Sequence, residues 1–261
     1  MRKDLDNLAY SSGFANTIDM FEQTKIKAVF FDAGGTLFET RGSVGEIYHS
    51  FARKYEVVTD PIRLQRDFEQ SFRRQPPLAF SRETPPDSIA ALEKGWWRTL
   101  VGEVFAEVGP FPAFDEFFDE VYEAFGGNRL WRVFDGVEST LEALKGRGLK
   151  LGVISNFDSR LFTVLEACGL RGYFDSIHVS TLTGAAKPSP TIFQEALETH
   201  GLEPSQACHI GDHPREDVEG ALAVGMRAFL LDHHQRFTDN PRFTRITHFE
   251  QLLWEEEFQQ D

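Results

Sequence analysis

The residues best placed to do chemistry lie in one short loop, directly after the apolar run 26–31, and they are Asp32, Gly34, Gly35 and Thr36. A carboxylate at the end of a buried strand can attack phosphorus covalently, and the backbone N–H groups of the glycines that follow can approach an anion. The same residue types also form an ordinary turn at the end of a strand. The loop alone leaves a catalytic and a purely structural interpretation open.

Three later segments carry polar side chains where a parallel α/β sheet would place them beside Asp32. One is an apolar run that ends in a serine and an asparagine, one holds a lysine before a proline, and one holds two aspartates five positions apart in a turn that opens a helix. The residues in question are Ser155, Asn156, Lys187, Asp212 and Asp217.

The chain after residue 133 alternates between predicted strands and predicted helices, as a parallel sheet requires. The predicted strands are 149–155, 176–180, 207–211 and 227–231. The predicted helices are 137–146, 159–169, 190–201 and 215–225, and each ends at or near a glycine. Because ligands of open parallel sheets bind outside the carboxyl ends of the strands, Asp32, Ser155 and Asp212 are expected to meet at one edge of the sheet, with Lys187 on a nearby loop.

A long helical excursion separates the first loop from these strands. Apolar residues recur there at spacings of three and four, and prolines and glycines interrupt them, which predicts helices at 44–55, 62–74, 88–108 and 114–125. We therefore expect a helical unit at 42–132, inserted into a Rossmann-like core made of 25–41 and 133–261. Residues 1–24 show no firm period and are interpreted as an N-terminal arm without assigned chemistry.

The composition is that of a globular protein with a strongly acidic balance. The chain has 261 residues, a net charge of −14 and a pI near 5.0, which argues against nucleic acid as a partner because phosphate backbones need a basic surface. Two cysteines are too few for a disulfide framework and predict reduced, buried thiols. No run of about 18 apolar residues predicts a membrane span, and the first ten residues lack an apolar signal core, so we expect a cytoplasmic protein.

The four segments, taken in order, resemble the haloacid dehalogenase superfamily, a group of hydrolases with an aspartate nucleophile that are mostly phosphatases. The resemblance extends over roughly residues 25–232. It implies a Rossmann-like parallel sheet with an all-helical cap of the first type, inserted after the first strand. It also implies a phosphatase that acts on a small phosphorylated metabolite through an aspartyl phosphate.

The resemblance assigns a role to each candidate residue. Asp32 is the nucleophile, and Lys187 balances the negative charge on Asp32 and the phosphoryl oxygens. Mg²⁺ is the implied cofactor, with Asp32, Asp212 and the Gly34 carbonyl as its ligands. Asp217 is expected to hold Lys187 or the waters of the metal. The expected phosphate-binding residues are Gly34, Gly35, Thr36, Ser155, Asn156 and Lys187.

Gly34 is the main departure from the family pattern. Most phosphatases of the superfamily carry a second aspartate there, which protonates the leaving oxygen and later activates water. General acid–base catalysis contributes about 10²–10⁴-fold. Either Glu39, Asp158 or His213 supplies the proton, or the leaving group needs none, or turnover is slow.

Other chemistries stay open. A dehalogenase would need no metal at Asp32, and a phosphonoacetaldehyde hydrolase would need a Schiff-base lysine, for which Lys54 and Lys94 are the candidates. A protein that binds phosphate without efficient catalysis is a further alternative. The segment 156–160 also resembles the branch related to the hydrolase-domain-containing-3 proteins, which tend to lack the second aspartate.

Overall fold

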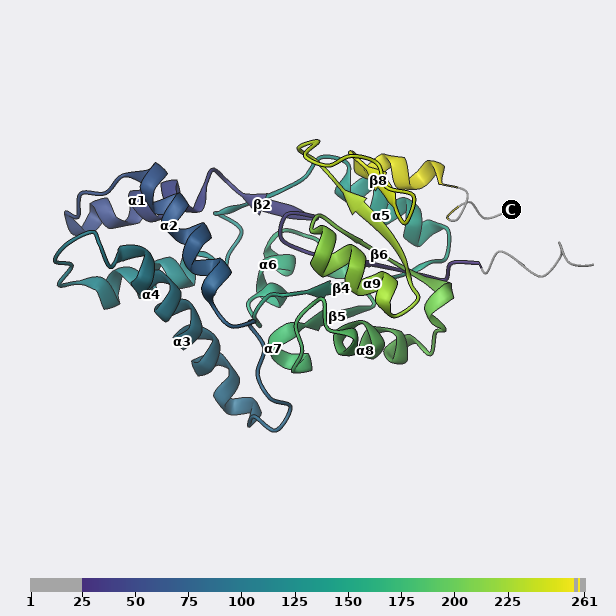
Figure 1. Ribbon diagram of the computed structural model, residues 1–261, viewed down its shortest axis with the longest axis horizontal. Coiled ribbons are helices and arrows are strands. Elements are labelled where there is room, and N and C mark those ends of the chain that lie inside the picture. Colours follow the sequence, from purple (N-terminus) through teal and green to yellow (C-terminus); the bar gives the residue numbers. More distant parts are fainter. Residues whose placement is uncertain (1–24, 256–257, 259–261) are drawn as a thin grey trace, which may run out of the picture.

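The computed structural model describes residues 25–255 and 258, so the predicted arm at 1–24 lies outside the described residues. The centre of the fold is a six-stranded parallel sheet in the order β5-β4-β1-β6-β7-β8 (Figure 1). Its strands are β1 (Ala28–Phe31), β4 (Lys150–Ser155), β5 (Ser176–Val179), β6 (Ala207–Gly211), β7 (Arg227–Leu231) and β8 (Thr244–Ile246).

Helices cover both faces of the sheet, which makes three layers. Alternate residues of β1 point to opposite faces, so that Val29 and Phe31 enter one apolar cluster and Phe30 enters the other. The first face is covered by α5 (Val137–Gly146), α6 (Leu161–Ala167) and the 3₁₀ helix Phe249–Trp254. The second face is covered by α8 (Pro190–His200) and α9 (Gly220–Ala223). With both faces buried, the central strands are mostly apolar, as parallel sheets usually are.

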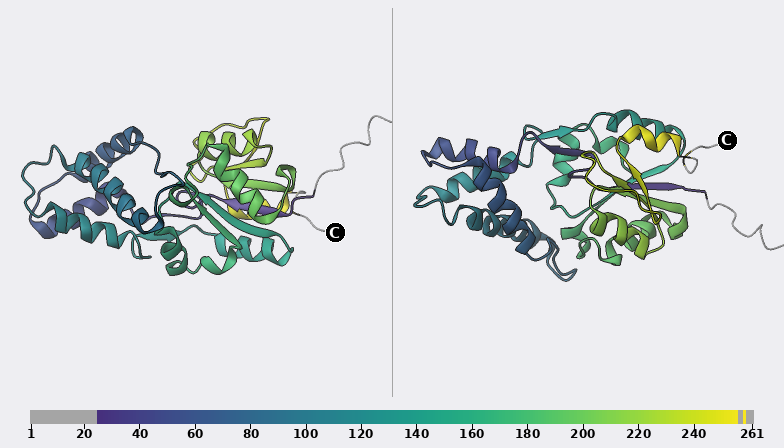
Figure 2. Two further views of the ribbon diagram at one scale, coloured as in Figure 1. Left: turned by 90° about the horizontal axis from the view of Figure 1, so that it is seen from below. Right: turned by 45° about the horizontal axis from the view of Figure 1, so that its top comes forward.

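Four helices form a separate unit off one end of the sheet, and the two views of Figure 2 agree on this arrangement. They are α1 (Val44–Ala52), α2 (Pro61–Arg74), α3 (Pro86–Phe105) and α4 (Phe114–Ala124), and together we call them the helical insert. A two-stranded antiparallel ribbon, β2 (Phe38–Thr40) and β3 (Trp131–Val133), joins the insert to the sheet. The insert has its own apolar cluster, centred on Tyr48, Phe105 and Phe117.

The predicted fold class is confirmed, and most predicted elements lie close to the observed ones. The exception among the helices is 215–225, which is a π-helical segment, Pro214–Glu219, followed by the short helix α9. The ribbon β2–β3, the strand β8 and the short helix α7 (Ser180–Thr183) are not predicted, because segments of three or four residues carry little periodicity. The domain boundaries stay a prediction.

Both cysteines are free, as expected, but only Cys208 is fully buried, whereas Cys168 is half-buried. In the part of the chain that the structure describes, no helix combines the length and the apolar character that a membrane span needs.

Candidate active site

The carboxyl end of the sheet holds a buried network of charged side chains around one lysine. The ammonium of Lys187 donates to Oδ1 of Asp32 at 2.7 Å and to Oδ1 of Asp217 at 2.6 Å. Asp32 is only 8% exposed and Lys187 only 4% exposed. Charge-assisted hydrogen bonds of this kind are short and strong, so the lysine fixes the orientation of both carboxylates.

The sheet register explains why residues far apart in sequence meet here. β1 lies between β4 and β6, with Phe31 opposite both Val153 and Ile210. Asp32 and Asp212 therefore emerge from neighbouring strands at the same edge, and the backbone N–H of Asp32 donates to the carbonyl of Ile210 at 2.8 Å. Ser155, the buried last residue of β4, reaches this edge from the other side of β1.

Two glycines permit the close approach of the carboxylates. A Cβ at Gly35, whose φ is +85°, would meet the Asp212 carboxylate at 2.8 Å. A Cβ at Gly211 would lie 2.1 Å from Cγ of Asp217. Gly34 differs from both, because a Cβ there would have no heavy atom within 4 Å. The site thus needs glycine at 35 and 211, but it has room for a side chain at 34.

Two of the residues predicted to bind phosphate, Gly35 and Thr36, use their backbone N–H groups within the loop. The backbone N–H of Gly35 donates to Phe38 O at 2.8 Å and that of Thr36 donates to Ala33 O at 3.3 Å, so both hold the loop in its turn. The hydroxyl of Thr36 donates to Oδ1 of Asp212 at 3.4 Å.

The side-chain amide of Asn156 is engaged with the segment that carries Lys187. Its Oδ1 accepts from the backbone N–H of Lys187 at 2.7 Å, and its Nδ2 donates to the carbonyl of Lys187 at 3.0 Å and to Glu216 at 3.1 Å. The amide therefore anchors the backbone that carries the lysine, and we interpret it as a positioning residue.

The electrostatics of the network divide its acids into two kinds. Burial by itself would lower the pKa of Lys187, but the adjacent Asp217 and Asp32 carboxylates outweigh it and raise that pKa. Burial would likewise raise the pKa of Asp217, yet Lys187 and the hydrogen bond from His209 lower it. At Asp212, burial and the nearby Asp32 and Asp217 carboxylates raise the pKa to about 7. The surroundings therefore favour the anionic form of Asp217, whereas at Asp212 they favour the protonated form.

His209 also belongs to this network, although it was not among the predicted site residues. Its Nε2 lies 3.0 Å from Oδ1 of Asp217, its side chain is fully buried, and burial lowers its pKa. A neutral imidazole with the proton on Nε2 donates this bond, which leaves the buried Nδ1 without a partner in the protein. The sequence feature that could have indicated this role is a histidine within a predicted strand, eight residues before Asp217.

Three carboxylates could share a cation. Asp32, Asp212 and Asp217 each offer an oxygen, and these oxygens lie within 4.8 Å of one another. Asp217 is already saturated by Lys187, by His209 and by the backbone N–H of His213, which donates to Oδ2 at 2.9 Å. The pair with open coordination is therefore Asp32 and Asp212.

Comparison with known proteins decides the family. A model of the haloacid dehalogenase-like hydrolases matches residues 26–225, most of the chain. The chain belongs to the haloacid dehalogenase-like hydrolase family. The resemblance predicted from the sequence motifs is thereby confirmed.

Proteins similar to this hydrolase include one named for its domain, one named as a phosphatase and one named as a dehalogenase. Haloacid dehalogenase-like hydrolase domain-containing protein 3 of Mus musculus is 37% identical over 216 residues, which cover 81% of this chain and 84% of the mouse protein. Glyceraldehyde 3-phosphate phosphatase of Methanothermobacter thermautotrophicus is 30% identical over 209 residues, covering 79% and 86%. The crystal structure of a 2-haloacid dehalogenase from Pseudomonas syringae pv. Tomato DC3000 is similar with a TM-score of 0.60 and 25% identity, covering 88% and 97%.

The structure places the three candidate replacement acids of this hydrolase in different settings. Asp158 is buried and accepts from Arg160 and from the Trp97 indole, so its carboxylate is engaged at the contact with the helical insert. The ring of His213 accepts from the backbone N–H of Glu216 and caps the π-helical segment. Glu39 pairs with Arg132 but lines a small polar pocket together with Gly35 and Asp212.

The two lysines considered for a Schiff base lie on the helical insert and are engaged elsewhere. Lys54 pairs with Glu120, and Lys94 pairs with Asp119 at 2.8 Å. Both side chains are largely exposed, at 54% and 40%. Their setting is that of surface ion pairs, which does not favour a phosphonoacetaldehyde hydrolase.

Proposed function

We propose that this hydrolase is a Mg²⁺-dependent phosphatase that acts on a small phosphorylated molecule through an aspartyl phosphate on Asp32. The observation that carries the proposal is the buried Lys187 ammonium between Asp32 and Asp217. A cation fixed beside the nucleophile neutralises the charge that phosphoryl oxygens bring into the site. The similarity to glyceraldehyde 3-phosphate phosphatase supports the same reaction class.

The proposed reaction has two displacements at phosphorus. First, a carboxylate oxygen of Asp32 bonds to phosphorus while the bond to the leaving oxygen breaks and its electron pair stays on that oxygen. Water then attacks phosphorus, which restores the Asp32 carboxylate and releases inorganic phosphate. Lys187 holds the nucleophile in place, and the Ser155 hydroxyl at the end of β4 is the proposed donor to a phosphate oxygen.

The carboxylates fit Mg²⁺, which prefers oxygen ligands and keeps several waters. We assign Asp32, Asp212 and the carbonyl of Gly34 as ligands. Asp217 holds Lys187 instead, because its oxygens already accept three hydrogen bonds. When bound, Mg²⁺ neutralises phosphate charge and orients the phosphoryl group for in-line displacement.

Gly34 sets the limit on efficiency. With no acid at this position, the leaving oxygen departs unprotonated unless Glu39, which lines the pocket beside Asp212, supplies a proton. We therefore expect acyl phosphates, whose carboxylate leaving groups need no proton, to be better substrates than alkyl phosphates.

Phosphate release from acetyl phosphate and para-nitrophenyl phosphate, with Mg²⁺ and with EDTA, tests the proposal. We expect Mg²⁺-dependent hydrolysis, faster for acetyl phosphate, and a loss of at least about 10⁴-fold in Asp32→Asn. Asp135→Asn, at an exposed aspartate of the core, is the matched control. Hydrolysis that survives Asp32→Asn would exclude this mechanism, and no hydrolysis of either compound would favour a phosphate-binding protein without efficient catalysis.

A further inference from the structure

The buried histidine of strand β6, His209, uses one ring nitrogen and leaves the other unpaired. Its Nε2 lies 3.0 Å from Oδ1 of Asp217, and the side chain is fully buried. Its Nδ1 has no hydrogen-bond partner among the residues that the structure describes. Because an ionised carboxylate can only accept, the proton lies on Nε2 and Nδ1 is an unpaired acceptor. A buried acceptor without a partner destabilises a fold, so the histidine has to be explained by something other than stability.

The surroundings of the imidazole would suit an apolar side chain. The residues opposite His209 on the neighbouring strands are Phe30 of β1 and Ala228 of β7, and both belong to the apolar cluster on the second face of the sheet. The ring of Phe193 in α8 stands perpendicular to the imidazole, with the ring centres 5.3 Å apart. An aliphatic side chain at residue 209 would pack here without leaving a polar atom unpaired. Packing alone therefore does not account for the histidine.

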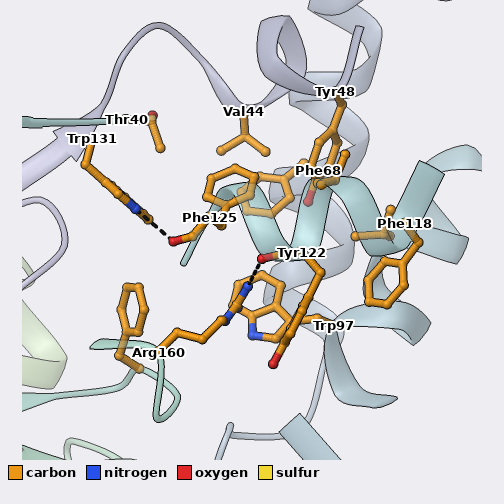
Figure 3. Close-up of a pocket in the computed structure, with 13 residues that line it drawn as sticks. Thr40, Val44, Tyr48, Phe68, Trp97, Phe118, Tyr122, Phe125, Trp131 and Arg160 are labelled. Atoms are coloured by element: carbon orange, nitrogen blue, oxygen red, sulfur yellow. Dashed lines mark hydrogen bonds between the residues drawn. The ribbon is translucent and has the colours of Figure 1, made fainter. Parts of the chain in front are cut away.

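Two tryptophans at the contact between the insert and the core show how other ring nitrogens of this protein are paired. They line a mostly apolar pocket of about 100 Å³ under the helical insert, which we call the apolar pocket (Figure 3). The indole N–H of Trp131 donates to Phe125 O at 2.9 Å, and the indole N–H of Trp97 donates to Asp158 at 2.6 Å. Nδ1 of His209 differs from both, because it is buried and has no such partner.

The bond from His209 is one of three that fix the carboxylate of Asp217. Oδ1 accepts from the Lys187 ammonium at 2.6 Å and from His209, while Oδ2 accepts from the backbone N–H of His213 at 2.9 Å. An aspartate carboxylate turns easily about its Cβ–Cγ bond, and one anchor on each oxygen stops that rotation. Since Lys187 is itself the flexible group to be placed, the two anchors are His209 and the backbone of His213.

The carboxylate of Asp217 in turn sets the position of the Lys187 ammonium. A lysine side chain is a flexible four-carbon stem, and here its ammonium lies between Oδ1 of Asp217 and Oδ1 of Asp32, at 2.6 and 2.7 Å. If the Asp217 carboxylate turns, the ammonium changes its position relative to Asp32. A displacement of about 1 Å at a reacting group can cost about 10²-fold in rate.

We infer that His209 is a positioning residue for the reaction at Asp32, because it holds Asp217 and thereby keeps the Lys187 ammonium beside the nucleophile. The inference rests on the proposed phosphatase activity. Burial lowers the pKa of His209, so the imidazole is neutral and donates a hydrogen bond without bringing a second cation to Asp217. A neutral donor orients the carboxylate and leaves its charge to Lys187.

Glutamine and methionine, two side chains of similar length, test the inference at residue 209. His209→Gln carries an N–H donor the same number of bonds from Cα as Nε2 of histidine, whereas His209→Met carries no donor and adapts to apolar surroundings. At saturating Mg²⁺, we expect kcat for acetyl phosphate to fall by about 10–100-fold in His209→Met and by less than about threefold in His209→Gln. KM should change by less than about threefold in both, because the residues proposed to bind phosphate are still present.

Thermal denaturation separates positioning from a purely structural role. His209→Met loses the hydrogen bond to Asp217 but also removes the unpaired acceptor, whereas the amide of His209→Gln keeps both. We therefore expect the two variants to melt within about 4 °C of each other. A larger fall in the melting temperature of His209→Met, or its failure to fold, would show that the histidine holds the fold together and would overturn the inference.

His178→Met is the matched control at another buried histidine of the same sheet. His178 in β5 is 6% exposed, and its Nε2 lies 3.2 Å from the hydroxyl of Ser176. We expect kcat to be unchanged in this variant. A loss of kcat equal to that in His209→Met would mean that the effect comes from disturbing the sheet, and it would overturn the inference.

The remaining outcomes separate this inference from the proposed function. Equal kcat values in His209→Gln and His209→Met, with acetyl phosphate hydrolysed by the wild type and not by Asp32→Asn, would overturn the inference and leave the proposed function intact. A loss in His209→Met that a higher Mg²⁺ concentration restores would mean that Asp217 acts on the metal, which would also overturn it. If the wild type hydrolyses no acyl phosphate, the proposed function is wrong and the inference falls with it.

Discussion

The charged network at the edge of the sheet and the apolar pocket under the helical insert differ in the forces that hold them. At the edge of the sheet, Lys187 joins Asp32 and Asp217, and Asp212 lies close to both carboxylates. In the pocket beside it, aromatic rings face each other and the one arginine is paired with Asp158. Under the proposed function, the charged region would bind the phosphate that any phosphorylated molecule carries, so it would not by itself distinguish one substrate from another.

The comparison also shows how differently the regions respond to change. A buried ion network is costly to disturb, because a removed partner leaves an unpaired charge in a medium of low polarity. An apolar wall loses contacts in proportion to the atoms removed. Large effects are therefore expected at the sheet edge and graded ones at the pocket.

The largest effect is expected from Lys187→Met. The substitution leaves the buried Asp32 and Asp217 carboxylates without their cation, so we expect a loss of about 3–5 kcal/mol in the free energy of unfolding and almost complete loss of phosphate release. Urea denaturation and the acetyl phosphate assay measure the two effects. Lys54→Met, at an exposed ion pair, is the control. Unchanged stability in Lys187→Met would show that the network is not held by this ion.

Gly34→Asp sharpens the comparison by adding the missing acid at the charged edge. Because a Cβ at this position meets no atom within 4 Å, we expect a folded protein with turnover of para-nitrophenyl phosphate raised by about 10²-fold. Gly34→Asn has the same size without the acid and should give no gain. Equal turnover in both variants would mean that Glu39 or another group already supplies the proton.

Gly35→Ala should have the opposite effect to a substitution at Gly34, because the loop has no space for a side chain at residue 35. The added Cβ would lie 2.8 Å from the Asp212 carboxylate. It would also strain the backbone, because residue 35 has a φ of +85°, which residues other than glycine rarely adopt. We expect weaker Mg²⁺ binding and lower turnover than in Gly34→Ala. Similar Mg²⁺ affinities of the two alanine variants, measured by calorimetry, would contradict the geometry of the loop.

Metal binding should depend on pH through Asp212. Burial and the adjacent Asp32 and Asp217 carboxylates raise its pKa to about 7, so below pH 7 the metal-free protein carries a proton that Mg²⁺ must displace. The dissociation constant of Mg²⁺ should therefore rise by about tenfold per pH unit as the pH falls below 7, and level off above it. Calorimetric titrations between pH 6 and pH 8 measure this, and a constant affinity over that range would refute it.

The smallest effect is expected where the insert is fastened to the core. The two carboxylate oxygens of Glu93 accept three hydrogen bonds from Ser159 and Thr181. Glu93→Gln keeps the size of the side chain but replaces one of these oxygens by an NH₂ group, which cannot accept. We therefore expect the free energy of unfolding to fall by about 1–3 kcal/mol. Glu103→Gln, at an exposed position of the same helix, is the control. The Mg²⁺ affinity of the core should not change, and a change there would show that the two regions are coupled.

Much of the catalytic end could be predicted from short segments. An apolar strand followed by Asp32, and a second one followed by Asp212, must meet if the sheet is parallel, since neighbouring strands end at the same edge. The phosphate-binding roles of Asn156, Gly35 and Thr36 stay predictions, and the hydrogen bonds that these residues make within the protein could not be foreseen, because a sequence does not show which partners a side chain or N–H group finds.

The sequence by itself determined the order of strands and helices and the residue types that reach the reactive edge, because both follow from local periodicity and from the residue at each strand end. Only the tertiary structure decided that Lys187 joins Asp32 to Asp217, that His209 supports Asp217, and that Arg160 is neutralised. It also decided the shape of the apolar pocket, because the walls come from residues between 40 and 160 that the packing of α3 against the core brings together. Contacts between distant residues depend on the packing of whole elements, which no local pattern specifies.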